Sequence, residues 1–258
     1  MSYYIEKQDY RRLGQSDLLI SPITLGTMTF GEQNTESEAF LQLDWAISHG
    51  INFIDTAPLY GHGNAERMIG SVLSKTNKEY VISTKVGRVL KKFAPEEIAG
   101  KVDGLAAFIG VDPTIFPVFD FSRDGILRSI QESLERLNIS SIDIALIHDA
   151  DDRIDEAIKN SYPVLDELRS QGVIKGIGVG MNICSYATKA VKEMDLDVIL
   201  IAGRYSLLDQ SAQEVLFKEC LKKQTGVMVG GVYNSGVLAN PTPESTYNYV
   251  PVTPEILS

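Results

Sequence analysis

The sequence has few cysteines and histidines and no long apolar run, and each shortage excludes a class of protein. Its 258 residues contain two cysteines, Cys184 and Cys220, which form no CxxC pair, so we expect reduced thiols rather than a disulfide framework. The three histidines have no partners at the spacing of a zinc site, and no Walker-type glycine loop is present. The sequence therefore predicts neither a metal centre nor a phosphate-binding P-loop.

Basic residues are scarce relative to acidic ones. The 24 Lys and Arg against 34 Asp and Glu give a formal net charge of −10, which opposes binding to nucleic acids and anionic membranes. No apolar run approaches the roughly 20 residues that cross a bilayer, and the opening MSYYIEKQDYRRLG lacks the apolar core of a signal peptide. We expect a soluble, cytoplasmic protein that acts on small molecules.

The sequence does contain a regular alternation of two patterns. Short apolar, β-branched runs predict seven buried strands, at residues 23–30, 52–57, 80–86, 141–149, 175–181, 197–203 and 227–232. Amphipathic stretches predict helices at residues 37–48, 65–74, 123–137, 162–171, 185–194 and 211–223. Strand and helix in alternation predict a parallel sheet with helices outside, and we favour one barrel domain over residues 1–258.

Three segments do not fit this repeat. Residues 10–21 predict a hairpin that plugs the bottom of the barrel, and residues 240–258 predict an irregular tail. The long connection at residues 88–122 predicts a packed lid on the substrate side. Its aromatic residues are Phe93, Phe108, Phe116, Phe119 and Phe121.

An eighth strand–helix unit is missing from the pattern. A barrel of seven parallel strands would have two unpaired edges, which proteins normally avoid. The expected explanations are a truncated sequence, or a gap covered by the amino-terminal hairpin or by another chain.

Four side chains suited to acid–base chemistry fall at the ends of successive predicted strands. Asp55 and Tyr60 lie in NFIDTAPLYGHGNAE, Lys85 lies in YVISTKVGR, and His148 lies in IDIALIHDAD. A phenol that protonates a carbonyl starts with a pKa of about 10 and needs a nearby cation to lower it. We expect Lys85 to supply that cation, Asp55 to keep the lysine charged, and His148 to orient the reacting oxygen.

Each of these residues also has an ordinary structural interpretation. Asp55 could cap the loop after its strand, and a lone histidine such as His148 is more often structural than catalytic. Lys85 is harder to explain in this way, because an unpaired lysine is rarely buried. His49 ends a helical stretch and favours a structural explanation, whereas His62 could line the pocket.

These motifs resemble those of the aldo-keto reductases. The resemblance covers residues 10–241 and rests on LGTMTFG, FIDTAPLYGHGNAERMIG, ISTKVGR and LIHD. Within the family, the His-Asp pair at 148–149 and GVYNSGVLA at 231–239 are most similar to the branch of D-threo-aldose and L-galactose 1-dehydrogenases. The resemblance implies a (β/α)₈ TIM barrel, here without its last βα unit, and an extended nicotinamide cofactor bound without a Rossmann fingerprint.

The resemblance also implies what individual residues do. Asp55, Tyr60, Lys85 and His148 match the catalytic tetrad of the family, in which the tyrosine exchanges a proton while a hydride moves between nicotinamide and substrate. The cofactor-binding positions that it implies are Gly26, Thr27, Met28, Asp55, Asn182, Tyr205 and Tyr233. No metal is implied.

The chain departs from the family pattern at the cofactor. Ala202 or Gly203 stands where a glutamine is usual, and Gly230 and Gly231 stand where an aromatic often stacks on the nicotinamide. The eighth unit of the family holds the ribose phosphate, so this sequence does not choose between NAD and NADP. If the chain is complete, we expect weakened cofactor binding.

We therefore expect a NAD(P)-dependent oxidoreductase that acts on an aldose, a lactol or another carbonyl compound. The alternative is a catalytically quiet barrel that serves as a binding or regulatory subunit, which the missing unit favours and the complete tetrad disfavours. A third possibility is an aldolase in which Lys85 forms a Schiff base. The physiological substrate and the oligomeric state are left open.

Overall fold

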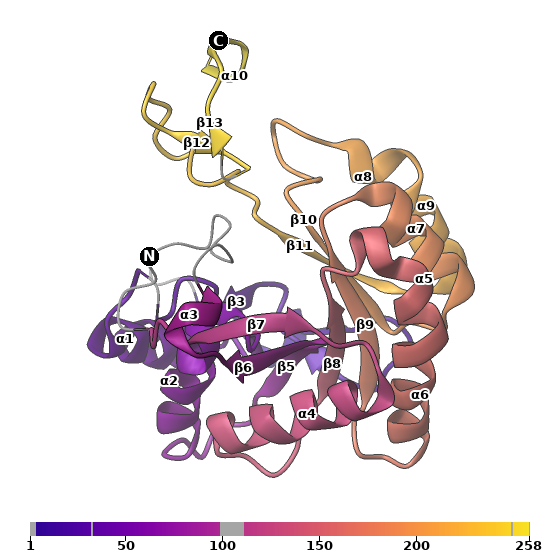
Figure 1. Cartoon of the computed structure of the whole chain (residues 1–258). Coiled ribbons are helices and arrows are strands. Elements are labelled where there is room, and N and C mark those ends of the chain that lie inside the picture. The colour runs from indigo at the N-terminus through magenta and orange to yellow at the C-terminus, as the bar shows by residue number, and fades with distance from the viewer. Residues whose placement is uncertain (1–3, 32, 99–110, 249, 258) are drawn as a thin grey trace.

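A seven-stranded parallel sheet forms the centre of the molecule (Figure 1). The computed structural model describes residues 4–31, 33–98, 111–248 and 250–257. The strands are β3 (Thr24–Gly26), β4 (Phe53–Asp55), β5 (Val81–Val86), β8 (Ile144–His148), β9 (Gly176–Met181), β10 (Val198–Ala202) and β11 (Gly226–Gly230). The order of the strands in the sheet follows their order along the chain. The sheet is curved into a nearly closed barrel of the (β/α)₈ TIM type, as predicted.

Helices cover the outer face of this barrel (Figure 1). They are α1 (Glu36–Ser48), α2 (Asn64–Leu73), α4 (Arg123–Leu137), α6 (Tyr162–Ser170), α7 (Cys184–Glu193), α8 (Ser211–Glu214) and α9 (Leu216–Lys223). Short turns η3 (Asp151–Arg153), α5 (Ile154–Glu156) and η4 (Ala157–Ser161) lead into α6. The predicted helix at 211–223 is wrong in one respect, because the backbone leaves the helical conformation at Val215.

Local sequence explains where the helices begin and end. Thr35 and Glu38 exchange hydrogen bonds with each other's backbone N–H groups and so form a capping box at the start of α1. Ser122 accepts from the backbone of Gly125 at the start of α4, and Asn138 ends that helix in the left-handed conformation that asparagine tolerates.

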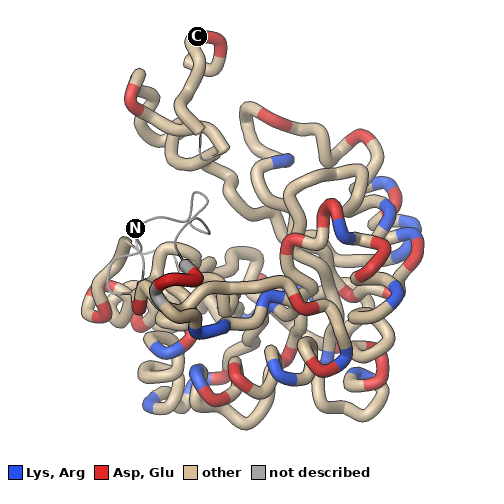
Figure 2. The backbone as a smooth tube through the Cα atoms, in the orientation of Figure 1, with Lys and Arg blue, Asp and Glu red and all other residues tan. Residues whose placement is uncertain are grey.

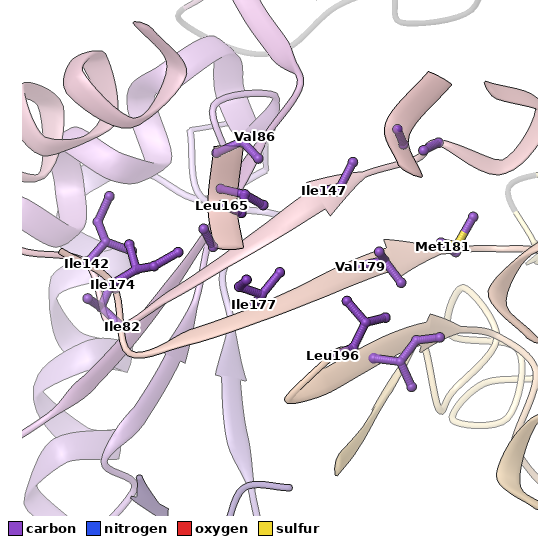
Figure 3. Close-up of a cluster of buried hydrophobic side chains, with 14 of the residues drawn as sticks. Ile82, Val86, Ile142, Ile147, Leu165, Ile174, Ile177, Val179, Met181 and Leu196 are labelled. Carbon is purple, nitrogen blue, oxygen red and sulfur yellow. The ribbon is translucent and has the colours of Figure 1, made fainter. Parts of the chain in front are cut away.

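Two apolar layers hold the barrel together. Outward-facing side chains such as Ile82, Ile147 and Ile177 pack against the helices, as Figure 3 shows for part of this layer. The second layer fills the lower interior, where residues of the amino-terminal hairpin meet Phe53 of β4. That hairpin pairs β1 (Arg11–Arg12) with β2 (Leu19–Ile20) and lies within the segment expected to plug the barrel.

The long connection contains strands that the sequence did not reveal. β6 (Arg88–Lys92) pairs antiparallel with β7 (Ile115–Phe119), and α3 (Pro95–Ile98) follows β6. The paired strands are joined by a long insertion rather than by a short turn, so the sequence lacks the local signal that identifies a hairpin. Phe108 lies outside the described residues.

The two ends of the sheet remain apart in the part of the chain that the structure describes. β3 and β11 each pair on one side only, as the missing eighth unit predicted. The tail contains a short ribbon of β12 (Thr246–Tyr247) and β13 (Val250–Pro251), followed by α10 (Pro254–Leu257). The expectation of an irregular tail is wrong at this ribbon, where Asn248 takes a left-handed turn conformation.

No helix among the described residues combines the length and the apolar composition needed to cross a bilayer.

Candidate active site

Three neighbouring strands bring the predicted acid–base residues together. β5 lies between β4 and β8, so the carboxyl ends of these strands meet at one mouth of the barrel. Asp55 ends β4, His148 ends β8, Lys85 is the penultimate residue of β5, and all three side chains are buried. Side chains alternate along a strand, so Lys85 lies on the same face of β5 as Ser83, the ladder partner of Asp55.

Lys85 uses all three of its ammonium donors. Its Nζ donates to Asp55 Oδ2 at 2.7 Å, to the carbonyl oxygen of Thr56 at 2.9 Å and to Tyr60 Oη at 2.9 Å. Ser83 Oγ donates to the other carboxylate oxygen of Asp55 at 2.7 Å. Burial opposes the charge of the lysine, but attraction to Asp55 and Tyr60 outweighs it and raises the pKa of Lys85. The lysine is therefore a permanent cation.

Tyr60 begins the 3₁₀ turn η2 (Tyr60–Gly63), and its ring meets the ring of His148 edge to face at 6.0 Å. Burial raises the pKa of Tyr60 to about 12, against the lowering effect of Lys85. The expectation of a lowered pKa is therefore wrong for the protein alone, because the loss of water around the phenol outweighs the cation. Tyr60 is a neutral phenol near pH 7.

His148 is also neutral. Burial lowers the pKa of His148 well below its ordinary value, and the positive charges of Lys85 and Arg88 add to the effect. Its Nε2 lies 3.5 Å from Asp149 Oδ2, and its buried Nδ1 has no hydrogen-bond partner among the described residues. A neutral imidazole beside the Tyr60 hydroxyl can donate one hydrogen bond to a substrate oxygen.

A network of polar residues lies beside His148 at the mouth. Arg88 Nη2 donates to Asp149 Oδ2 at 2.8 Å, and Asn182 Nδ2 donates to Asp149 Oδ1 at 3.0 Å. Arg204 Nε donates to the carbonyl oxygen of Asn182 at 2.8 Å, and the backbone N–H of Asn182 donates to Asp151 at 3.0 Å. The backbone and side chain of Asn182 are therefore both held in place.

Our sequence reasoning did not identify Arg88, Asp151 or Arg204 as site residues. Arg88 follows the lysine motif TKVGR directly, and Asp151 lies in the HDAD run, so position after a strand was an available signal. Their partners come from other strands, however, and sequence spacing does not show those contacts.

Two groups can be distinguished among the expected cofactor-binding residues. Gly26 pairs with Asp55 in the β3–β4 ladder, Thr27 Oγ1 donates to the carbonyl oxygen of Asp55 at 2.9 Å, and Met28 follows them. These three residues and Asn182 are therefore at the same mouth as the tetrad.

Tyr205 and Tyr233 are placed differently. Their exposed fractions are 40% and 65%, and Tyr205 packs edge-on against Phe217 at 4.9 Å. Between described residues, no hydrogen bond or ring contact joins either tyrosine to the tetrad.

The β6–β7 ribbon packs beside the mouth through its aromatic residues. The guanidinium of Arg88 lies over the Phe119 ring at 4.4 Å. Phe116 contacts Phe93 and the buried His62, whose ring centroid is 5.7 Å away. This arrangement is compatible with the lid expected from the sequence, and it places His62 under the ribbon.

The remaining histidine, His49, stacks on Trp45 at 4.0 Å at the end of α1. Within the described ranges, no group of three or more His, Cys, Asp or Glu side chains is arranged to hold a metal ion.

The sequence of the chain is similar to those of known proteins. Residues 22–249 match the model of the aldo/keto reductase family. The chain is 38% identical over 217 residues to D-threo-aldose 1-dehydrogenase from Pseudomonas sp, covering 83% of this chain and 65% of that protein. It is 32% identical over 279 residues to pyridoxal 4-dehydrogenase from Microbacterium luteolum, covering 99% of this chain and 80% of that protein.

A solved structure gives the same result at the level of the fold. The holo form of an aldo-keto reductase from Bacillus halodurans superposes with a TM-score of 0.74 at 28% identity, covering 92% of this chain and 70% of the other. The chain thus spans about two thirds of the length of several proteins that it matches.

The resemblance inferred from the motifs, including its aldose dehydrogenase branch, is confirmed by these matches. The chain belongs to the aldo-keto reductase family.

Proposed function

We propose that this protein is a NAD(P)-dependent oxidoreductase that interconverts a carbonyl group and the corresponding hydroxyl group, with Tyr60 moving the proton. One observation carries the proposal. Lys85 donates to the phenol oxygen of Tyr60 and has its other two donors on Asp55 and Thr56. The phenol oxygen is therefore an acceptor toward the lysine, and its own O–H is available to a substrate oxygen.

The residues at the mouth fit the nicotinamide end of such a cofactor. The backbone at Gly26 has open space around it, since an added Cβ there would meet nothing within 4 Å. Asn182 presents an amide to the mouth, which is suited to pairing with a carboxamide. A bound nicotinamide supplies or accepts the hydride, and the protein residues perform the rest.

Proton transfer follows from the charges around the phenol. In the reduction direction, Tyr60 Oη and the neutral imidazole of His148 donate to the carbonyl oxygen, and the phenol gives up its proton as that oxygen becomes negative. The ammonium of Lys85, 2.9 Å away, stabilises the phenolate that remains. Asp55 keeps the ammonium charged and in place.

The rate of oxidation relative to the rate of reduction should depend on pH. The pKa of Tyr60 is about 12, so the proton donor for reduction is fully present near pH 7. Oxidation of a hydroxyl needs the phenolate, whose fraction grows as the pH rises toward that pKa. Oxidation is therefore expected to gain rate with pH over a range in which reduction stays constant.

Two points guide the choice of substrate. The similarity to an aldose 1-dehydrogenase supports an aldose or lactol, and the similarity to a pyridoxal dehydrogenase supports a ring-bearing alcohol or aldehyde as the second class. A Schiff-base aldolase is disfavoured, because Lys85 has a raised pKa and three occupied donors and is therefore a poor nucleophile.

The cofactor itself is best chosen by titration. Lys223 is the last basic residue of the chain, and Figure 2 shows only acidic and neutral residues along the described part beyond it. We therefore propose to measure binding of NADH and NADPH separately, by the change in nicotinamide fluorescence. Binding of one with turnover of aldoses or aldehydes supports the oxidoreductase, and binding without any turnover supports the quiet barrel.

The proton-transfer assignment is tested with Tyr60→Phe. This change removes only the phenol oxygen, so dinucleotide binding should remain within about twofold, while turnover should fall by a factor of about 10² to 10⁴, as expected for loss of a general acid. Single-turnover kinetics and a fluorescence titration measure the two effects separately. A Phe variant that retains wild-type turnover would remove Tyr60 from the reaction.

A further inference from the structure

Asp149 has an unusual backbone conformation directly after the catalytic strand β8. Its φ angle is 47°, and its backbone N–H donates to the carbonyl oxygen of Gly180 at 2.8 Å. Few residues with a side chain adopt this left-handed conformation, although Asp and Asn tolerate it better than most. The conformation turns the carboxylate toward the mouth of the barrel, where it meets its partners.

The Asp149 carboxylate connects the ends of three strands. Oδ2 accepts from Arg88 Nη2 at 2.8 Å and lies 3.5 Å from His148 Nε2, and Oδ1 accepts from Asn182 Nδ2 at 3.0 Å. Arg88 follows β5, His148 ends β8, and Asn182 follows β9. One side chain therefore contacts the proton-transfer half and the cofactor half of the site.

The contact with Asn182 fixes the orientation of its amide. A carboxylate only accepts hydrogen bonds, so it selects the NH₂ end of Asn182, and the carbonyl oxygen of that amide is left for another donor. A carboxamide NH₂ is such a donor. Without the carboxylate, the amide could rotate and present the wrong group.

The contact with Arg88 balances charge. The guanidinium is largely buried, with 18% of the side chain exposed, and it stacks on Phe119. Loss of the carboxylate would leave a buried cation near His148 and Tyr60, which is costly and would disturb both groups.

We propose that Asp149 is a positioning residue that orients Asn182 for the nicotinamide amide and balances Arg88 beside the proton-transfer groups. This inference rests on the proposed function. Asp149 does not touch the reacting atoms in this account; it acts through its three neighbours.

The best variant is Asp149→Asn, because asparagine tolerates the same backbone conformation and differs by one group. It removes the negative charge and one of the two acceptor atoms. The matched control is Asp155→Asn on the surface of α5, where the carboxylate is 82% exposed and pairs with Lys189. Circular dichroism and thermal unfolding establish that both variants are folded.

The first measurement is dinucleotide affinity. We expect the dissociation constant of whichever of NADH and NADPH binds the wild type to rise about tenfold in Asp149→Asn and to stay unchanged in Asp155→Asn. Asn182→Ala should raise it similarly, and the double variant Asp149→Asn/Asn182→Ala should show no additive loss. An additive double variant would overturn the proposed link between the two residues.

The second measurement needs no cofactor. The negative charge of Asp149 helps to raise the pKa of Tyr60, so the phenol should ionise at lower pH in Asp149→Asn. Carbon-13 NMR of labelled tyrosine reports this, with Tyr60→Phe assigning the signal. The charged and titratable groups around Tyr60 are Asp55, Lys85, Arg88, His148 and Asp149, with Asp151 and Arg204 beyond them, and only Asp149 is changed.

The outcomes separate the inference from the proposed function. If the wild type binds neither dinucleotide, the proposed function is wrong and this inference falls with it. If the wild type binds one and Asp149→Asn binds it equally well, with unchanged ionisation of Tyr60, only the positioning assignment is overturned. A variant of Asp149 that fails to fold leaves Asn182→Ala to decide, because unchanged affinity there also overturns the inference.

Discussion

At the scale of single residues, the site depends on one buried ion pair. Lys85 and Asp55 have side-chain exposures of 1% and 6%, and their charged atoms are 2.7 Å apart. A buried pair of this kind adds little net stability over apolar residues, but the loss of one partner leaves an uncompensated buried charge. The pair is therefore better explained by the need for a fixed cation beside Tyr60 than by stability.

This explanation predicts a large cost for Lys85→Met. The free energy of unfolding should fall by about 3–5 kcal/mol, because the carboxylate of Asp55 stays buried without its cation. Urea denaturation measures it. Lys175→Met is the matched control, since Lys175 pairs with Asp143 at the same 2.7 Å but is 64% exposed, and its loss should cost no more than about 1 kcal/mol. Equal losses of unfolding free energy in Lys85→Met and Lys175→Met would contradict the distinction between the buried and the exposed lysine.

The four candidate acid–base residues could be located from the sequence, whereas their ionisation could not be predicted. Asp55, Tyr60, Lys85 and His148 stand in recognisable motifs, and the structure brings them together. The pKa of Tyr60 depends on how much water the fold removes from the phenol, which no local pattern records.

At the scale of elements, one buried glutamate of α2 connects that helix to strand β5 and to helix α4. Glu66 of α2 is fully buried and accepts from Thr84 of β5 at 2.7 Å and from Arg136 of α4 at 2.6 Å. Thr84 precedes Lys85, and α2 follows the turn that carries Tyr60. This contact therefore couples two helices to the strand that holds Lys85.

Glu66→Ala should lower the free energy of unfolding by about 3–5 kcal/mol, because it removes the carboxylate nearest to the largely buried Arg136 and leaves Thr84 without its acceptor. Chemical denaturation is the measurement. Glu132→Ala provides the comparison: this glutamate also faces Arg136, at 3.6 Å, but is 31% exposed, so its removal should cost less than about 1 kcal/mol. A small loss in Glu66→Ala would show that the buried contact does not hold these elements.

Element prediction succeeded where a pattern is local and failed where pairing is distant. The strand and helix periods identified the seven strands of the sheet and the helices that cover them, with α8 and α9 merged into one, because burial on one face leaves a regular apolar repeat. The β6–β7 ribbon was missed, because its strands pair across a long insertion and are only partly buried.

At the scale of the whole molecule, burial of a neutral histidine links stability to pH. Burial lowers the pKa of His148 in the folded chain, so below its ordinary value of about 6.5 the unfolded chain binds a proton that the folded chain does not. The unfolded state then binds more protons, so stability falls as the pH drops below that value. Burial also lowers the pKa of His62, so His62 contributes to the loss of stability at low pH with the same sign.

We therefore expect His148→Asn to lose less stability on acidification than the wild type. For one proton, the difference in slope approaches about 1.4 kcal/mol per pH unit below pH 6.5. Urea denaturation of both proteins at pH 7.5, 6.5 and 5.5 gives the slopes. Parallel curves would mean that His148 already ionises freely in the folded protein.

The sequence by itself determined the barrel elements, their parallel order, the family and the four acid–base residues, because each leaves a local pattern or motif along the chain. Only the tertiary structure decided that burial raises the pKa of Tyr60 by more than Lys85 lowers it. The tertiary structure also decided that Asp149 contacts Arg88, His148 and Asn182, and that the β6–β7 ribbon packs at the mouth. These features depend on desolvation and on contacts between residues distant in sequence. Both arise only when the chain has folded.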